Sequence, residues 1–196
     1  MSLSSAADLD SLLNAIELIV LDVDGVLTDG AIIVDDNGIE SKHFHVRDGS
    51  GISLWRKSGK RIAILSGRRA ACVEVRGKEL GISPIIQGEP RKLAPFLKLI
   101  DSMNLRPSQV CYMGDDLPDL PILRVAGLAA CPGDAVEEVR AMAHLVTRAG
   151  GGQGAVREVI ERLLKHQGLW EAALGATYAL NVPPIESVGR EDESRK

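Results

Sequence analysis

The 196-residue sequence is poor in aromatic side chains, which make up only 3% of it. A buried core must therefore be aliphatic, and the stacked aromatics that hold unpaired nucleic-acid bases are not in evidence. Basic residues are not in excess either, because the formal net charge is -4. These two shortages argue against a nucleic-acid partner and against an anionic membrane surface, since both attract basic patches.

Cysteine is scarce, and long apolar runs are missing. The three cysteines, Cys72, Cys111 and Cys131, are an odd number without a CxxC pair, which favours reduced thiols over a disulfide framework or a zinc site. No apolar run approaches the roughly 18 residues of a spanning helix, and the first residues lack the basic and apolar segments of a signal peptide. We therefore expect a cytoplasmic protein without a membrane partner.

The sequence does contain a strand-like run that ends in two carboxylates, within residues 18–30, LIVLDVDGVLTDG. Continuous apolar residues are typical of a central parallel strand covered on both faces. Strand side chains alternate, so Asp22 and Asp24 leave the carboxyl end on the same side, where open α/β sheets bind ligands. Neighbouring carboxylates need a cation or a shared proton, so the pair predicts a divalent metal, acid–base chemistry or both. Turn-capping aspartates would explain Asp24 beside Gly25 but not Asp22.

Strand-like and helix-like segments alternate along the rest of the chain, which predicts an α/β fold with a Rossmann-like parallel sheet and helices on both faces. The length suits one domain, which we place at residues 1–168, before a tail at 169–196 that is partly disordered or reaches a neighbouring subunit. Residues 31–34 and 39–46 predict two strands joined through Asn37-Gly38, a strong hairpin signal. A hairpin at about 31–46 should therefore project beside the carboxylates, and Asp48 is expected to cap the following helix.

Further polar side chains follow predicted strands. Ser66 ends one strand, Lys92 follows another closely, and Asp115 follows a third. Their convergence would place a site at the carboxyl edge of one sheet. His43 and His45 share a strand face and could bind zinc, but no further histidine or cysteine lies near them in sequence, so we favour a solvated face.

Residues 22–29, DVDGVLTD, resemble motif I of the haloacid dehalogenase superfamily of phosphotransferases. Ser66, Lys92 and Gly114-Asp115-Asp116 match the superfamily's later motifs in order. The resemblance implies a phosphomonoesterase in which Asp22 attacks phosphorus, Asp24 is the general acid and base, and Ser66 and Lys92 hold the phosphoryl oxygens.

The same resemblance implies a magnesium cofactor. Mg²⁺ prefers oxygen ligands, and the Asp22 carboxylate, the Asp24 carbonyl oxygen and Asp115 would suit it. Asp116 or Asp119 would orient Lys92 or cap the next helix.

Many superfamily members close their site with an inserted cap domain, but the segments between residues 25 and 61 and between 92 and 114 are too short for one. The chain is similar to capless members, which are homotetramers whose hairpins associate. Over residues 18–165 it most resembles the phosphatases of 3-deoxy-D-manno-octulosonate 8-phosphate, enzymes of lipopolysaccharide sugar synthesis, with matching stretches at 44–49, 66–68 and 147–158. That resemblance implies substrate contacts from His45, Val46, Arg47, Asp48, Gly49, Arg68, Arg76 and Lys92.

One departure and three alternatives stay open. Ser53 stands where that family often has a basic residue, which removes a possible substrate contact. Phosphatases of nine-carbon keto-sugar acid 9-phosphates tend to have an acid where this chain has Arg68, so Arg68 favours the eight-carbon substrate. The alternatives are therefore a nine-carbon or broader sugar-phosphate phosphatase, a non-catalytic tetrameric scaffold, and a receiver domain with strand-end acids. A scaffold has no reason to keep buried charges that lower stability, and a receiver does not explain Asp24.

Overall fold

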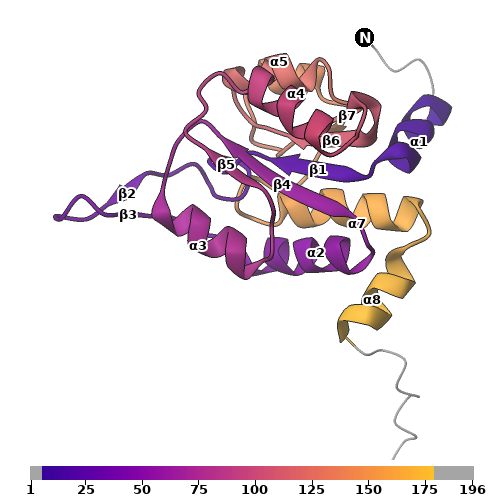
Figure 1. Cartoon of the computed structure of the whole chain (residues 1–196), viewed down its shortest axis with the longest axis horizontal. Coiled ribbons are helices and arrows are strands. Elements are labelled where there is room, and N and C mark those ends of the chain that lie inside the picture. Colours follow the sequence, from indigo (N-terminus) through magenta and orange to yellow (C-terminus); the bar gives the residue numbers. More distant parts are fainter. Residues whose placement is uncertain (1–5, 179–196) are drawn as a thin grey trace, which may run out of the picture.

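A computed structural model describes residues 6–178 of the chain (Figure 1). Strands and helices alternate along it, as the sequence predicts. The elements are α1 (Ala6–Ala15), β1 (Leu18–Leu21), β2 (Ile33–Val34), β3 (Glu40–Ser41), α2 (Val46–Lys57), β4 (Arg61–Ser66), α3 (Ala71–Glu79), β5 (Ile85–Gln87), α4 (Leu93–Ser102), β6 (Val110–Met113), α5 (Leu120–Leu123), β7 (Leu128–Cys131), α6 (Glu137–Met142), β8 (Leu145–Val146), α7 (Ala155–His166) and α8 (Trp170–Tyr178), with short 3-10 turns at Pro107–Gln109 and Leu117–Asp119.

Within these residues, six strands form one parallel sheet in the order β5-β4-β1-β6-β7-β8. The predicted α/β fold with a parallel sheet is confirmed. β1 lies between β4 and β6, with Leu21 opposite Ile64 on one side and Met113 on the other. The carboxyl ends of these three strands therefore meet at one edge, which is where the strand-end polar residues lie.

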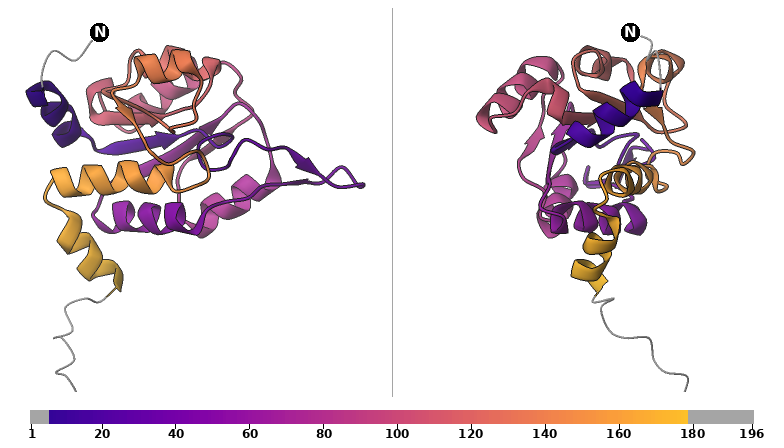
Figure 2. Two further views of the ribbon diagram at one scale, coloured as in Figure 1. Left: turned by 180° about the vertical axis from the view of Figure 1, so that it is seen from behind. Right: turned by 90° about the vertical axis from the view of Figure 1, so that its right-hand side faces the viewer.

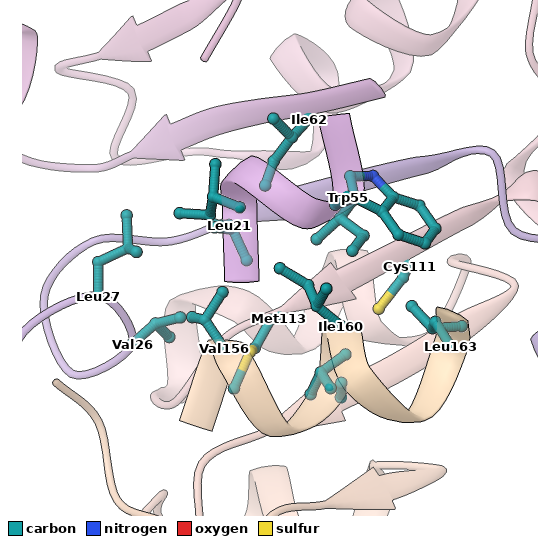
Figure 3. Close-up of a cluster of buried hydrophobic side chains, with 14 of the residues drawn as sticks. Leu21, Val26, Leu27, Trp55, Ile62, Cys111, Met113, Val156, Ile160 and Leu163 are labelled. Carbon is teal, nitrogen blue, oxygen red and sulfur yellow. The ribbon is translucent and has the colours of Figure 1, made fainter. Parts of the chain in front are cut away.

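Helices cover both faces of the sheet because the strand residues are apolar on both sides. Ile19 and Leu21 join a core built against α2 and α7, in which Trp55 and Ile160 are fully buried (Figure 3). Leu18 and Val20 join a second core against α4, α5 and α6. The two further views in Figure 2 show these helix layers on opposite sides of the sheet. β1 is thus fixed from both faces, which holds its carboxyl end rigid.

The β2–β3 hairpin projects away from this body (Figures 1 and 2). Its turn is closed by Asp35, whose Oδ1 accepts bonds from the backbone N–H groups of Asn37 (2.9 Å) and Ile39 (2.8 Å). The pairing is shorter than the sequence predicts: only Ile33 opposite Ser41 and Val34 opposite Glu40 are paired. Residue 46 belongs to α2 rather than to the hairpin.

The cap of α2 differs from our expectation. His45, not Asp48, is the N-cap residue, and its ring Nδ1 accepts a hydrogen bond from the backbone N–H of Arg47 at 3.3 Å. Asp48 instead lies within the first turn of the helix, is 1% exposed, and accepts bonds from the backbone N–H groups of Gly154 (3.2 Å) and Arg157 (2.8 Å). The prediction that Asp48 caps this helix is therefore wrong, because Asp48 binds N–H groups at the start of α7.

The segment placed in the C-terminal tail begins with a helix. α8 starts at Trp170, whose ring lies 5.4 Å from the Arg157 guanidinium and 5.2 Å from the Lys165 ammonium of α7. Residues 179–196, and with them most of the segment expected to reach a neighbouring subunit, lie outside the described residues. Within residues 6–178, no helix combines the length and the apolar character needed to cross a membrane.

Candidate active site

A cavity of about 420 Å³ opens at the carboxyl edge of β1, β4 and β6. The structure gathers eight of the predicted site residues around it: Asp22, Asp24, Ser66, Arg68, Lys92, Asp115, Asp116 and Asp119. Asp22 and Asp24 follow β1, Ser66 ends β4, and Asp115 follows β6, so the sheet alone explains why residues far apart in sequence meet here. Lys92 reaches the cavity from the residue just before α4.

Lys92 is clamped between two carboxylates. Its Nζ donates to Asp22 Oδ2 at 2.6 Å and to Asp119 Oδ1 at 2.7 Å, and its side chain is only 4% exposed. Burial alone would lower the pKa of Lys92, but the two carboxylates outweigh it and hold that pKa above its usual value. The ammonium group is therefore a fixed positive charge beside Asp22.

Asp119 is saturated by hydrogen-bond donors. Tyr112 OH donates to the same Oδ1 that Lys92 contacts, at 2.6 Å, while Oδ2 accepts bonds from the backbone N–H groups of Asp115 (3.0 Å) and Asp116 (3.3 Å). A carboxylate engaged in this way orients Lys92 and the β6 loop. The geometry supports both roles considered for Asp119, because it contacts Lys92 and also completes the capping box of the 3-10 turn at Leu117–Asp119. Tyr112 is a partner that sequence reasoning missed.

The carboxylates of Asp22, Asp115 and Asp119 crowd together, with one oxygen of each within 4.8 Å of the others. Burial, followed by repulsion from Asp22 and Asp119, raises the pKa of Asp115 to about 8. Burial also raises the pKa of Asp22, to about 6. This crowding fits a bound divalent cation, which would stabilise both carboxylates in their ionised forms.

Gly25 makes room for the Asp115 carboxylate. A Cβ at residue 25, where φ is +78°, would lie 2.0 Å from Asp115 Oδ2. Glycine is thus required both by the backbone conformation and by the close approach of the acid. The Asp24-Gly25 pair is a turn, as the alternative interpretation held, but this turn delivers a carboxylate to the site.

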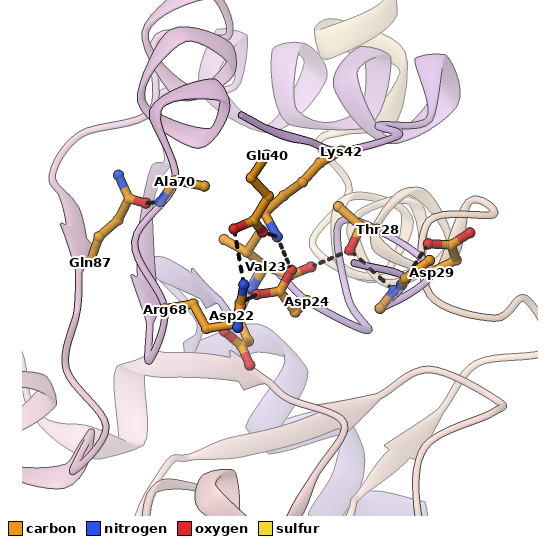
Figure 4. Close-up of polar contacts among 12 residues, drawn as sticks. Asp22, Val23, Asp24, Thr28, Asp29, Glu40, Lys42, Arg68, Ala70 and Gln87 are labelled. Carbon is orange, nitrogen blue, oxygen red and sulfur yellow. Dashed lines mark hydrogen bonds and ion pairs between the residues drawn. The ribbon is translucent and has the colours of Figure 1, made fainter. Parts of the chain in front are cut away.

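Asp24 points to a second set of charges, in which Glu40 and Lys42 come from the hairpin and Arg68 from the residues after β4 (Figure 4). Its Oδ1 is paired with Lys42 Nζ, and its Oδ2 lies 3.6 Å from Arg68 Nε. Glu40 bridges the same two cations, at 2.7 Å from Lys42 Nζ and 2.9 Å from Arg68 Nη2. Sequence reasoning missed Glu40 and Lys42; their signal is two charged residues with a spacing of two at the base of a hairpin next to Asp24.

A glycine-rich loop at residues 150–154 supports the turn that carries Asp24. The backbone N–H of Gly152 donates to the carbonyl oxygen of Val26 at 3.0 Å. A Cβ on Gly151 would lie 1.9 Å from the carbonyl oxygen of Gly25, so only glycine allows this approach. Because Asp48 binds the N–H of Gly154, the chain of contacts runs from α2 through the loop to the turn that carries Asp24.

The structure does not bring His45, Val46, Arg47, Asp48, Gly49 or Arg76 to the cavity of their own chain. Arg47 lines a separate groove of about 1130 Å³ along α7. Gly49 lies under Arg76, since a Cβ there would come within 2.6 Å of Arg76 Nη2, and that guanidinium donates to Glu79 at 2.8 Å. Their predicted substrate contacts are therefore not explained by a single copy of the chain.

Comparison with known proteins agrees with this arrangement. A family model of haloacid dehalogenase-like hydrolases matches residues 42–127. The 3-deoxy-D-manno-octulosonate 8-phosphate phosphatase KdsC of Escherichia coli K12 is 44% identical over 170 residues, which cover 87% of this chain and 90% of the relative. The chain belongs to the KdsC family of haloacid dehalogenase-like hydrolases.

Solved structures extend this similarity to the backbone. A crystal structure of the Moraxella catarrhalis 3-deoxy-D-manno-octulosonate 8-phosphate phosphatase, in complex with magnesium ion, phosphate ion and KDO, has a TM-score of 0.84 and 41% identity, covering 87% of this chain and 98% of that one. A probable YrbI family phosphatase from Pseudomonas syringae pv. phaseolica 1448a has a TM-score of 0.83 and 48% identity, covering 86% and 96%. This chain is a phosphoric monoester hydrolase with Mg²⁺ as its cofactor.

Proposed function

We propose that the chain hydrolyses 3-deoxy-D-manno-octulosonate 8-phosphate to the free sugar acid and inorganic phosphate. The observation that carries this proposal is that Arg68 lines the same cavity as Asp22 and Lys92. A phosphorylated keto-sugar acid has a phosphate at one end and a carboxylate at the other, and a planar guanidinium can hold a carboxylate with two parallel hydrogen bonds. The cavity therefore presents groups for both ends of this substrate.

Asp22 is the nucleophile in this reaction. Its carboxylate attacks phosphorus, the bond from phosphorus to the sugar oxygen breaks, and an aspartyl-phosphate forms. Ser66 donates a hydrogen bond to a phosphoryl oxygen and Lys92 supplies positive charge beside it. When bound, Mg²⁺ neutralises the charge of the phosphoryl oxygens; Asp22, Asp115 and the carbonyl oxygen of Asp24 would hold it.

Asp24 moves the protons. Its carboxyl group gives a proton to the departing sugar oxygen, and the resulting carboxylate then takes a proton from the water that attacks the aspartyl-phosphate. Phosphate leaves with the water's oxygen, and Asp22 and Asp24 return to their starting forms. Asp24 lies two residues after Asp22 and lines the same cavity, as this pair of roles requires.

The assembly we propose is a homotetramer in which the hairpins associate. The hairpin exposes Ile32 (57%), Val34 (55%) and Ile39 (62%) to solvent, and an isolated two-stranded hairpin is marginally stable in water. In this assembly a neighbouring copy would close the site and exclude water, and His45 to Gly49 with Arg76 would contact a substrate held by that copy. The free cysteines Cys111 and Cys131 are buried, which suits a cytoplasmic enzyme of lipopolysaccharide sugar synthesis.

The test is phosphate release with and without Mg²⁺ from three esters: 3-deoxy-D-manno-octulosonate 8-phosphate, a nine-carbon keto-sugar acid 9-phosphate and p-nitrophenyl phosphate. We expect kcat/KM for the eight-carbon ester to exceed the others by roughly tenfold or more. Asp22→Asn, which keeps the shape of the nucleophile, should abolish release. Preference for the nine-carbon ester would replace the proposed substrate, equal turnover would leave only a general phosphatase, and no turnover would favour the scaffold.

A further inference from the structure

We propose that Lys42 of the hairpin is a positioning residue for catalysis, which holds the Asp24 carboxyl group in the orientation needed for proton transfer. This inference rests on the proposed function of Asp24 and names a residue outside the superfamily motifs. Lys42 Nζ contacts Asp24 Oδ1 directly and lies 2.7 Å from Glu40 Oε1. Lys42 follows β3, whereas Asp24 follows β1, so the contact joins the hairpin to the catalytic turn.

Burial distinguishes Lys42 from the other cation at Asp24. The Lys42 side chain is 1% exposed and does not line the cavity, whereas the Arg68 side chain is 47% exposed and does. Arg68 can therefore turn toward a substrate carboxylate, but Lys42 has no path to the substrate. Its effect on the reaction must pass through Asp24.

The surroundings of Lys42 fix its position. Its Nζ contacts the carboxyl groups of both Asp24 and Glu40. Glu40 also binds Arg68 at 2.9 Å, so Lys42 is held between two carboxyl groups that share a second cation. A buried ion pair with several partners holds one geometry far better than an exposed pair, and a general acid or base must stay within hydrogen-bond reach of the proton it moves.

A purely structural reading has Lys42 only anchoring the hairpin to the body. That reading predicts lower thermal stability or altered assembly in Lys42 variants, with unchanged kcat in the protein that remains folded. Positioning predicts a loss of kcat with little change in KM, because the interaction acts on proton transfer rather than on substrate binding. The two readings thus differ in a measurable quantity.

The experiment is a double-mutant cycle with Lys42→Met and Asp24→Asn on the full chain with Mg²⁺, run on both the eight-carbon sugar ester and p-nitrophenyl phosphate. We expect Lys42→Met to lower kcat by about 10- to 100-fold, part of the 10²- to 10⁴-fold typical of general acid–base catalysis. In the Asp24→Asn background the same change should have less than about a twofold effect, because a residue that acts through Asp24 has nothing left to position. Lys42→Arg should recover much of the loss.

The control is Lys60→Met, which also removes a mostly buried lysine from an ion pair, with Glu17 at 2.7 Å, but away from the cavity. It should leave kcat unchanged.

The proposal is overturned if Lys42→Met keeps the kcat of the parent enzyme, if Lys42→Met lowers kcat as much in the Asp24→Asn background, or if Lys60→Met lowers kcat by as much as Lys42→Met does. Should Lys42→Met not fold, Lys42→Gln takes its place in the cycle. A parent enzyme that turns over only p-nitrophenyl phosphate refutes the proposed substrate yet still gives the cycle, and one that turns over neither ester refutes both.

Discussion

The catalytic edge of the sheet and the projecting hairpin are held in place by opposite means. At the edge, Asp22, Lys92 and Asp119 are buried, and each is fixed by a strand, a loop or another charge of the same chain. The hairpin has two residue pairs of ladder and exposes apolar side chains on its outer part. Its base nevertheless brings Lys42 against Asp24. The difference teaches that the sheet alone gathers Asp22, Lys92 and Asp119, whereas two of the charges around Asp24, those of Glu40 and Lys42, come from an element with few contacts of its own.

The largest expected effect on stability tests the buried edge. Lys92→Met leaves Asp22 and Asp119 facing each other without a cation, and breaking a buried ion pair in this way costs about 3 to 5 kcal/mol. We expect this loss in urea unfolding at pH 8 without metal, and a smaller one at pH 5, where Asp22, with a pKa near 6, is protonated. Lys98→Met, at an exposed position of α4, is the matched control. Equal stability of the Lys92 and Lys98 variants would show that the clamp contributes nothing.

Magnesium should stabilise the same edge in a pH-dependent way. The pKa of Asp115 is raised from 3.8 to about 8, so between these values the folded protein binds more protons than the unfolded chain, and metal-free stability falls as pH rises through this window. Because Mg²⁺ binds the ionised form, its stabilisation should be larger at pH 8 than at pH 5, about 2.7 kcal/mol at 100 times its Kd. Thermal unfolding with and without Mg²⁺ measures this. Asp115→Asn should remove the difference; a variant that keeps it would exclude Asp115 as a ligand.

A smaller loss of stability is expected from a change in α2, the helix that follows the hairpin. Asp48→Ala removes the carboxylate that binds the N–H groups of Gly154 and Arg157, and loss of such a helix cap costs about 1 to 2 kcal/mol. Arg47→Ala, at an exposed neighbour, should stay within about 0.5 kcal/mol in the same chemical denaturation. If Asp48→Ala instead kept its stability and raised KM alone, the substrate contact implied by resemblance would be the better account of Asp48.

Sequence alone predicted the parts of the molecule in which apolar and polar residues follow a regular pattern. Apolar runs followed by polar residues predicted the strands, a parallel sheet and the meeting of Asp22, Ser66 and Asp115, because carboxyl ends of parallel strands share an edge. It failed where a contact depends on three-dimensional approach: Lys42 to Asp24, Tyr112 to Asp119, and Asp48 to α7. These side chains are separated from their partners by loops whose path no local pattern encodes. Asp48 shows this most clearly, since the sequence predicted it as the N-cap of α2, whereas it binds the start of α7.

The smallest effect on stability, and the largest on assembly, is expected from the hairpin. Ile32 and Ile39 are 57% and 62% exposed, so the double change Ile32→Lys and Ile39→Lys removes little burial from a single copy and should alter its unfolding free energy by less than about 0.5 kcal/mol. If hairpins associate in the enzyme, the added charges separate the copies, since like charges at a shared apolar contact repel. Sedimentation should then report a single-chain mass in place of a tetramer, and turnover should fall because no neighbour closes the site.

The control for this prediction is Leu97→Lys, at a 43% exposed apolar position of α4, which should change neither mass nor turnover. An unchanged mass in the hairpin variant would place the contact elsewhere and leave the exposed hairpin without a role in assembly.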